Sequence, residues 1–235
     1  LEYRGINRDK EVVLFGAGPT VKNFEIIENA IYVGCNRAFL YDKVNFDYLF
    51  SIDKVGINQY YDEFFKYRKN ECIKFIGDQN LGENWQIPEH KIPLDVHRYL
   101  TNAGLEYLKH EYPLDISTSM LHNPPTVTLQ AMQFILWTQP KRVYIVGVDC
   151  TTATQGHFKG EKYDTNLRNE DSSSNDTWVI YWYKKLKDFA NCYYPDTEII
   201  SVNPVGLKGI FKDVYTESYL AEYPEIREEL GENLE

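Results

Sequence analysis

The sequence predicts an α/β domain built on a mostly parallel sheet that is flanked by helices, with an inserted lid or small subdomain. Two observations carry this prediction. Short apolar runs recur along the chain, each as long as a strand that is buried on both faces of a parallel sheet. Segments with helical periodicity separate several of these runs, as crossover connections between parallel strands require. The 235 residues, 43% of them hydrophobic, suffice for one such domain.

The clearest predicted strands are residues 12–15, which run into Gly16, and residues 143–146, which run into Gly147. Continuous apolar runs of this length are typical of strands in the interior of a sheet. The other predicted strands cover residues 31–33, 48–50, 72–76 and 199–202.

Helices are predicted between these strands. Residues 21–28 allow two helical turns, and residues 57–67 allow a longer helix. Residues 129–136 repeat apolar side chains at helical spacing, and Gln139-Pro140 ends that helix. A later helix has Asn175 or Asp176 as its N-cap, and aromatic side chains on one face at Trp178, Tyr181, Trp182 and Phe189.

We expect a single domain over residues 1–215. Its weakest pattern lies in residues 77–119, which predict a flap of short elements that includes a helix within residues 96–109. The polar residues 150–175 predict a lid, and the acidic residues 216–235 predict a helical tail.

The charge and the cysteines exclude several classes of protein. A net charge of −10 argues against a nucleic-acid groove or an anionic membrane surface as partner, because both require basic patches. We find no signal peptide and no apolar run near the roughly 18 residues of a membrane span. The four cysteines form no C-x-x-C pair, which favours reduced thiols in a cytoplasmic protein over a zinc site or disulfides. The start at Leu1 leaves open that the chain is a piece of a longer protein.

The first strand ends in the turn Gly16-Ala17-Gly18-Pro19-Thr20. Glycine lets a backbone approach a phosphate closely, and backbone N–H groups at a helix start bind anions. Thr20 adds a hydroxyl and can cap the following helix. A plain tight turn uses the same residues, so the turn alone leaves both interpretations open.

Polar residues also follow other strands. Asn36, within Gly-Cys-Asn-Arg, offers a donor and an acceptor to a base, a ribose or a sugar, or else it completes a local turn. Asp53 and Asp149 close two further strands, where each is a structural cap or a ligand-binding group. Because ligands of open α/β sheets bind beyond the carboxyl ends of the strands, several polar strand ends together predict a site at that edge.

The order of these motifs resembles a known family. The segments G-A-G-P-T, V-G-C-N-R-A-F-L-Y-D and D-Y-L-F-S-I-D resemble the N-terminal half of bacterial sialyltransferases of glycosyltransferase family 42. They are similar also to the related family that includes archaeal hydroxymethylpterin diphosphokinase and flagellin-glycosylation proteins. P-T-V-T-L-Q-A, K-R-V-Y-I-V-G-V-D and I-S-V-N-P follow in the same order, so the resemblance spans roughly residues 12–211.

This resemblance implies a Rossmann-like, nucleotide-sugar-binding domain of bacterial polysaccharide biosynthesis. A CMP-linked sugar would lie over the first turn, with its phosphate and ribose on Gly16, Ala17, Gly18, Pro19 and Thr20. Asn36 would contact the nucleotide, and Thr126 or Thr128 would hold the cytidine side; Arg37 and Asp53 are further candidates. Ala17 replaces the asparagine usual in the sialyltransferases and resembles the pterin-kinase branch more closely.

The resemblance departs at the catalytic base. The sialyltransferases have a histidine just before the helix that follows the lid, whereas residues 172–176 here read Ser-Ser-Ser-Asn-Asp. His157 in the lid and Asp176 are candidate replacements, and Asp149 is a third candidate catalytic residue. Thr151, Thr152 and Tyr163 would hold the departing phosphate through their hydroxyls, as tyrosines do in the resembled families.

Three functions follow from the sequence. The first is an inverting glycosyltransferase that moves a sugar from a CMP-activated donor to a glycan acceptor and requires no metal. The second is a diphosphokinase that uses Mg²⁺, for which Asp53 and Asp149 are candidate ligands. The third is a non-catalytic nucleotide-binding domain of a larger polysaccharide-biosynthesis protein. Whether the chain forms a homo-oligomer is left open.

Overall fold

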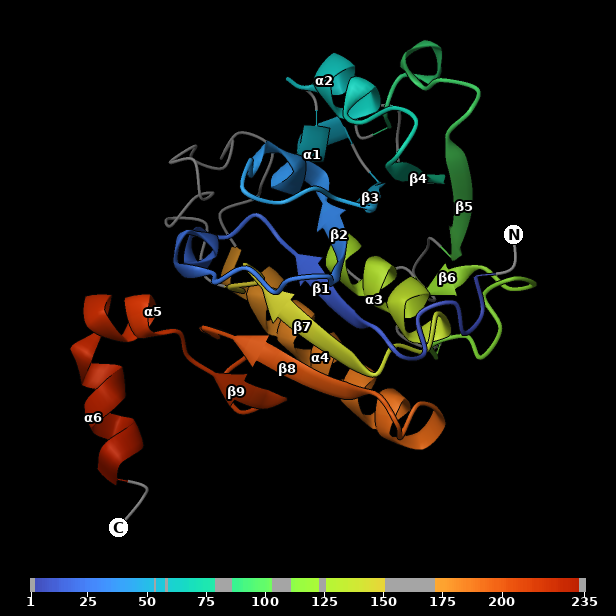
Figure 1. Cartoon of the computed structure of the whole chain (residues 1–235). Coiled ribbons are helices and arrows are strands. Elements are labelled where there is room, and N and C mark those ends of the chain that lie inside the picture. The colour runs from blue at the N-terminus through green and yellow to red at the C-terminus, as the bar shows by residue number, and fades with distance from the viewer. Residues whose placement is uncertain are drawn as a thin grey trace.

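The chain forms a parallel sheet with helices on both faces (Figure 1). The computed structural model describes residues 3–52, 54–57, 59–78, 86–102, 111–122, 126–150 and 172–232. In that part of the chain the sheet has nine strands in the order β6-β5-β4-β3-β2-β1-β7-β8-β9, and every neighbouring pair is parallel. The predicted fold class is confirmed.

The strands are short. Their bounds are β1 (Glu11–Phe15), β2 (Ile31–Cys35), β3 (Tyr48–Ser51), β4 (Ile73–Asp78), β5 (His97–Asn102), β6 (Leu121–His122), β7 (Arg142–Val146), β8 (Glu198–Val202) and β9 (Lys212–Val214).

The helices include three short 3₁₀ turns. These are η1 (Pro19–Asn23), η2 (Asn36–Leu40) and η3 (Glu89–Lys91). The α-helices are α1 (Lys54–Ile57), α2 (Tyr61–Lys66), α3 (Val127–Trp137), α4 (Ser172–Tyr193), α5 (Glu217–Glu222) and α6 (Pro224–Glu232).

Strand β1 shows why the sheet is covered on both sides. Val12 and Leu14 belong to one core, with residues of α3 and α4, whereas Val13 and Phe15 belong to a second core, with residues of η1, η2 and α2. All four side chains are fully buried. An apolar residue at every position is therefore what a strand with two packed faces requires.

The order of the strands reverses at β1. The chain adds β2 to β6 on one side of β1 and then returns through α3 to place β7 on the other side. The connection after β1 begins with η1 on one face, while α4, which precedes β8, packs on the opposite face. Connections that leave neighbouring strands toward opposite faces open a crevice at the carboxyl edge, where ligands of such sheets bind.

The predicted helix within residues 96–109 is wrong for the described part, because His97–Asn102 forms strand β5. This strand pairs in parallel with β4, with Phe75 opposite His97. Arg98 and Leu100 are exposed and Thr101 is buried, which is the alternation of a strand. Pairing with the neighbouring strand β4 decides between helix and strand here. Strands β6 and β9 were not predicted either.

Other elements differ in their bounds. The predicted turns at 21–28 are one 3₁₀ helix at Pro19–Asn23, and the predicted helix at 57–67 is shortened to Tyr61–Lys66. Helix α4 begins at Ser172, so Asp176 lies inside it rather than at its N-cap. Its aromatic residues lie on one side of the helix, since the ring centres of Trp178 and Tyr181 are 5.8 Å apart and those of Tyr181 and Trp182 are 5.2 Å apart. Trp182 is buried there, whereas Trp178 and Tyr181 are exposed.

The acidic tail is helical over α5 and α6, as predicted. Figure 1 shows both helices beyond the carboxyl ends of β7 and β8, with α5 near the body and α6 extending from it. Tyr219 on α5 is buried with 4% of its surface exposed. Within the described ranges, no helix is both long enough and apolar enough to span a membrane.

Candidate functional site

The loops that follow β1 and β7 bind each other at the carboxyl edge. Gly16 N donates to Val146 O at 2.8 Å, and Gly18 N donates to Gly147 O at 2.8 Å. These two contacts continue the ladder between β1 and β7 beyond the strand ends. The first turn is thus held by the second loop, at the point where the strand order reverses.

Asp149 completes this junction. Its Oδ2 accepts from Thr20 N at 3.1 Å, and its Oδ1 accepts from Thr20 Oγ1 at 2.5 Å. Only 7% of each residue's surface is exposed. A carboxylate at the start of η1 satisfies a helix N-terminal amide, as an N-cap does, although it comes from a residue 129 positions away.

Two glycines are required by this close approach. A Cβ on Gly18 would lie 2.4 Å from Asp149 Oδ2, so no side chain fits there while the carboxylate holds Thr20. Gly147 has a φ of +65°, and a Cβ on it would lie 2.2 Å from Val21 Cγ2. Glycine adopts positive φ without steric cost, so Gly147 serves the turn and the packing together.

The predicted phosphate cradle is not open in this structure. The backbone N–H groups of Gly16, Gly18 and Thr20 all donate to acceptors of the chain itself. Ala17 and Pro19, between them, are half-buried. A phosphate at this corner must displace the Asp149 carboxylate or take its hydrogen bonds from other groups. The carboxylate accepts hydrogen bonds, so it offers none to a phosphate.

Burial raises the pKa of Asp149 above its ordinary value. The two hydrogen bonds from Thr20 act in the opposite direction and offset only part of this effect. Ionising this carboxyl group therefore costs more than ionising an exposed one, as desolvation by burial requires.

We predict that the stability of the wild-type protein relative to Asp149→Asn falls as the pH rises. The folded state binds the proton of Asp149 more tightly than the unfolded state, whose pKa is near the ordinary value of 3.8. The loss begins at that pH, ends at the raised pKa of the folded state, and amounts to about 1.4 kcal/mol for each pH unit between the two. Urea unfolding of both proteins between acidic and neutral pH measures it; parallel stability curves would contradict it.

Asn36 opens η2 directly after β2, in a left-handed conformation with a φ of +51°. Its Oδ1 accepts from Ser51 Oγ at 2.9 Å, and a Cβ on Gly56 would lie 2.4 Å from its amide carbon. Asn36 is thus fixed between β3 and α1. The guanidinium of Arg37 lies 5.6 Å from the ring centre of Tyr60, so this neighbour points toward the start of α2.

Thr126 and Thr128 belong to a chain of hydrogen-bonded hydroxyls, called the relay below, at the start of α3. Thr126 is the N-cap, its Oγ1 lies 3.0 Å from Thr128 Oγ1, and Tyr183 donates to Thr128 Oγ1 at 2.9 Å. Tyr183 and Thr128 are buried, so the half-buried Thr126 is the outer end of this relay. Sequence analysis missed Tyr183, although it lies beside Trp182 in the predicted aromatic helix.

Sequence analysis also missed the residues that hold η1. Asn203, which follows β8 with a φ of +50°, donates to Thr216 Oγ1 at 3.0 Å and accepts from Thr216 N at 2.9 Å. Thr216 Oγ1 in turn donates to the carbonyl of Asn23, the last residue of η1, at 2.8 Å. A polar residue directly after a strand, the signal that pointed to Asn36, could have found Asn203.

Several candidates cannot be placed. His157, Thr151, Thr152, Tyr163 and Asp53 lie outside the described residues, and for Asp176 only the backbone is described. Among the described residues, no group of three or more His, Cys, Asp or Glu side chains is arranged to hold a metal.

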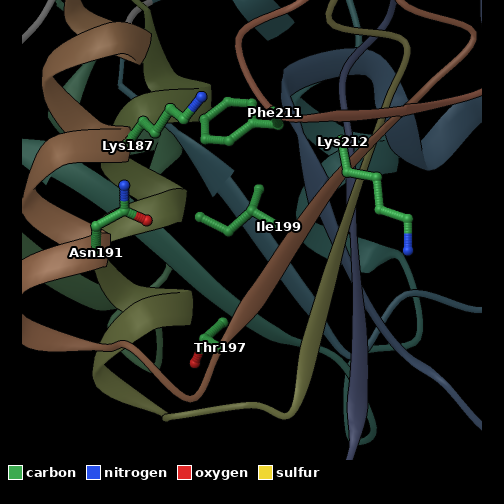
Figure 2. A pocket seen from close by; sticks show the side chains of 6 residues that line it. All are labelled: Lys187, Asn191, Thr197, Ile199, Phe211 and Lys212. Atoms are coloured by element: carbon green, nitrogen blue, oxygen red, sulfur yellow. The ribbon is translucent and has the colours of Figure 1, made fainter.

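A cavity of about 260 Å³ lies at the other edge of the sheet (Figure 2). Figure 2 shows Lys187 and Asn191 of α4 over Ile199, near the amino ends of β8 and β9. The amino ends of parallel strands face away from the β1–β7 junction. This cavity is therefore separate from the candidate site.

The comparisons agree with the fold. No protein-family model and no curated sequence matches the chain. Among solved structures, the MAf glycosyltransferase from Magnetospirillum magneticum AMB-1 is similar, with 16% identity, a TM-score of 0.53, and a match over 92% of this chain and 35% of that chain. The present chain thus spans about one third of that protein, and the likeness shows a shared α/β fold.

Two structures of a sialyltransferase are similar at lower TM-score. One is CST-II in complex with a trisaccharide acceptor and CMP, with 16% identity and a TM-score of 0.48. The other is CstII from Campylobacter jejuni in complex with CMP-3FNeuAc, with 12% identity and a TM-score of 0.48. Each match covers 82% of this chain and 80% of the sialyltransferase.

Proposed function

We propose that the chain is a glycosyltransferase domain that binds a nucleotide-linked sugar, most simply a CMP-activated acidic sugar, and transfers it to a glycan. One observation carries this proposal. At the point where the strand order reverses, the β1 and β7 loops join through Asp149 and Thr20, and helices η1 and α4 of the two connections pack on opposite faces of the sheet. The motif resemblance to sialyltransferases supports the class of donor, and the MAf likeness supports the fold.

The groups at the junction suit a ligand rich in hydroxyls. Thr20 uses one acceptor position on each oxygen of Asp149. A carboxylate has about four such positions, so both oxygens of Asp149 can also accept from a ribose or a sugar. Thr126, at the start of α3, would hold the cytidine side, and Asn36 the nucleotide from the end of β2.

The proposed reaction is an inverting transfer that requires no metal. The phosphate of a CMP donor leaves as a stable anion, so the protein must deprotonate the acceptor hydroxyl and stabilise an oxocarbenium-like centre. We assign the base to His157 or Asp176 rather than to Asp149, because the remaining acceptor positions of Asp149 are assigned above to hydroxyls of the donor. Thr151, Thr152 and Tyr163 remain the proposed ligands of the leaving phosphate.

Calorimetric titration with CMP, CDP, UDP and ATP, each with and without Mg²⁺, tests the proposal. We expect CMP to bind at least about tenfold more tightly than UDP, a difference of about 1.4 kcal/mol, and to bind equally well in EDTA. Binding of ATP alone, and only with Mg²⁺, would favour the diphosphokinase instead.

Activity separates a transferase from a binding domain. We expect slow hydrolysis of a CMP-linked acidic sugar by the wild-type protein, and loss of that hydrolysis in His157→Ala or in Asp176→Asn. Donor binding without hydrolysis, unchanged in both variants, would instead support a non-catalytic domain.

A further inference from the structure

Helix α5 lies along η1 and is tied to it at both ends. Before its first residue, Thr216 donates to Asn23 O, and Ser218 donates to the same carbonyl at 3.2 Å. At its last residue, Glu222 accepts from Lys22 Nζ at 2.5 Å and from Asn23 Nδ2 at 3.0 Å. Figure 1 shows α5 at the carboxyl edge of the sheet, beside the first turn after β1. The helix is therefore part of the surroundings of the candidate site.

Two tyrosines mark α5, Tyr219 within the helix and Tyr223 as its C-cap. Thr216, Tyr219 and Tyr223 follow helical spacing, and Thr216 and Tyr219 are buried. Tyr223 is half-buried, and its ring centre lies 4.7 Å from that of Tyr219. Because Tyr219 is packed behind it and both ends of α5 are held, the exposed part of the Tyr223 ring has a fixed direction.

Both phenols are near the junction of β1 and β7. Burial raises the pKa of Tyr219 to about 12, with smaller contributions from Tyr223 and then from the charge of Asp149. Burial also raises the pKa of Tyr223, followed by the charge of Glu222 and, more weakly, that of Asp149. The contacts of η1 show the same placement: Asp149 holds Thr20 near the start of η1, and Glu222, the neighbour of Tyr223, holds Lys22 and Asn23 at its end.

We propose that Tyr223 is a specificity-determining residue that packs its ring against the sugar of the donor, beside the carboxylate of Asp149. A sugar ring has an apolar C–H face and a rim of hydroxyls. An aromatic ring with a neighbouring carboxylate matches both, since one packs on the face and the other accepts from the hydroxyls. The inference rests on the proposed function, because it assigns the sugar half of the same donor.

Titrations with two probes test it: an unreactive analogue of a CMP-linked acidic sugar, and CMP alone. In Tyr223→Ala, we expect binding of the sugar nucleotide to weaken about 5- to 10-fold while CMP binding stays within about twofold, a loss typical of one well-placed ring contact. Tyr223→Phe keeps the ring and should bind both probes like the wild type. Tyr193→Ala, an exposed tyrosine at the end of α4, is the control and should change neither affinity.

The outcomes separate this inference from the proposed function. If the wild-type protein binds neither probe, the proposed function fails. If it binds both, then an equal loss for both probes in Tyr223→Ala, or no loss, overturns the role of Tyr223 alone. A loss in Tyr223→Phe as large as in Tyr223→Ala would assign the effect to the hydroxyl, which contacts Glu222, and would also overturn packing by the ring. Thermal unfolding of each variant confirms that it is folded at the titration temperature.

Discussion

Replacing Gly18 with valine is expected to lower the free energy of unfolding by about 3 kcal/mol and to weaken CMP binding more than tenfold. The first carbon of the new side chain would lie 2.4 Å from Asp149 Oδ2 and 2.8 Å from Gly147 O. The carboxylate must then leave Thr20, whose buried amide loses its acceptor. An unsatisfied buried donor costs about 1–3 kcal/mol, and overpacking adds about 1–3 kcal/mol.

Urea unfolding measures the first effect, and calorimetry well below the unfolding midpoint measures the second. Gly231→Ala is the control, because nothing lies within 4 Å of a Cβ at this exposed position of α6. Its free energy of unfolding should change by less than about 1 kcal/mol, and in the stabilising direction, since alanine favours a helix. A folded Gly18→Val with unchanged affinity for CMP would remove the β1 turn from the site.

The same variant shows what a local motif leaves undecided. From the turn alone, Gly18 is expected to matter for the ligand and not for folding. The structure adds a second reason for glycine, since Asp149 approaches from a loop 131 positions further along the chain. The contact depends on the strand order, which no local pattern contains.

The strands that sequence analysis found are those whose burial is visible in the residues themselves. In β1, four consecutive apolar side chains are fully buried, and the predicted range misses only Glu11. Strands β6 and β9 have two and three residues, and the first and last residues of β9 are exposed. Such edge strands carry no apolar run, because their pairing comes from a neighbour that is already formed.

The candidate site was predictable to the same degree. Asn36 and Asp149 stood out because polar residues that follow apolar strands converge at one edge of a parallel sheet. Which of these residues accepts the hydrogen bond of the Thr20 amide depends on the distances between the loops. The amides of the predicted cradle lie at the point where the strand order reverses, and there the amide of Thr20 is bonded to an acceptor of the chain itself.

Asn203→Ala is expected to lower the free energy of unfolding by about 3 kcal/mol. The Asn203 side chain, with 1% of the residue's surface exposed, holds Thr216 by two hydrogen bonds, and Thr216 holds the end of η1. Removing it leaves the buried amide of Thr216 without its acceptor, at about 1–3 kcal/mol. The left-handed backbone adds about 1 kcal/mol, because alanine tolerates a φ of +50° less well than asparagine.

A matched variant separates these two contributions. Asn29 has a φ of +61° but is exposed, so Asn29→Ala contains the backbone contribution and should cost about 1 kcal/mol. The excess of Asn203→Ala over Asn29→Ala, about 2 kcal/mol in urea unfolding, then measures the contacts that fasten Thr216. Because those contacts also fasten η1, amide hydrogen exchange in α5 and η1 should accelerate together in Asn203→Ala and stay unchanged in Asn29→Ala. Equal costs for the two variants would mean that the strand end after β8 does not hold the first turn, and that the contacts of Ser218 and Glu222 with η1 position α5 without it.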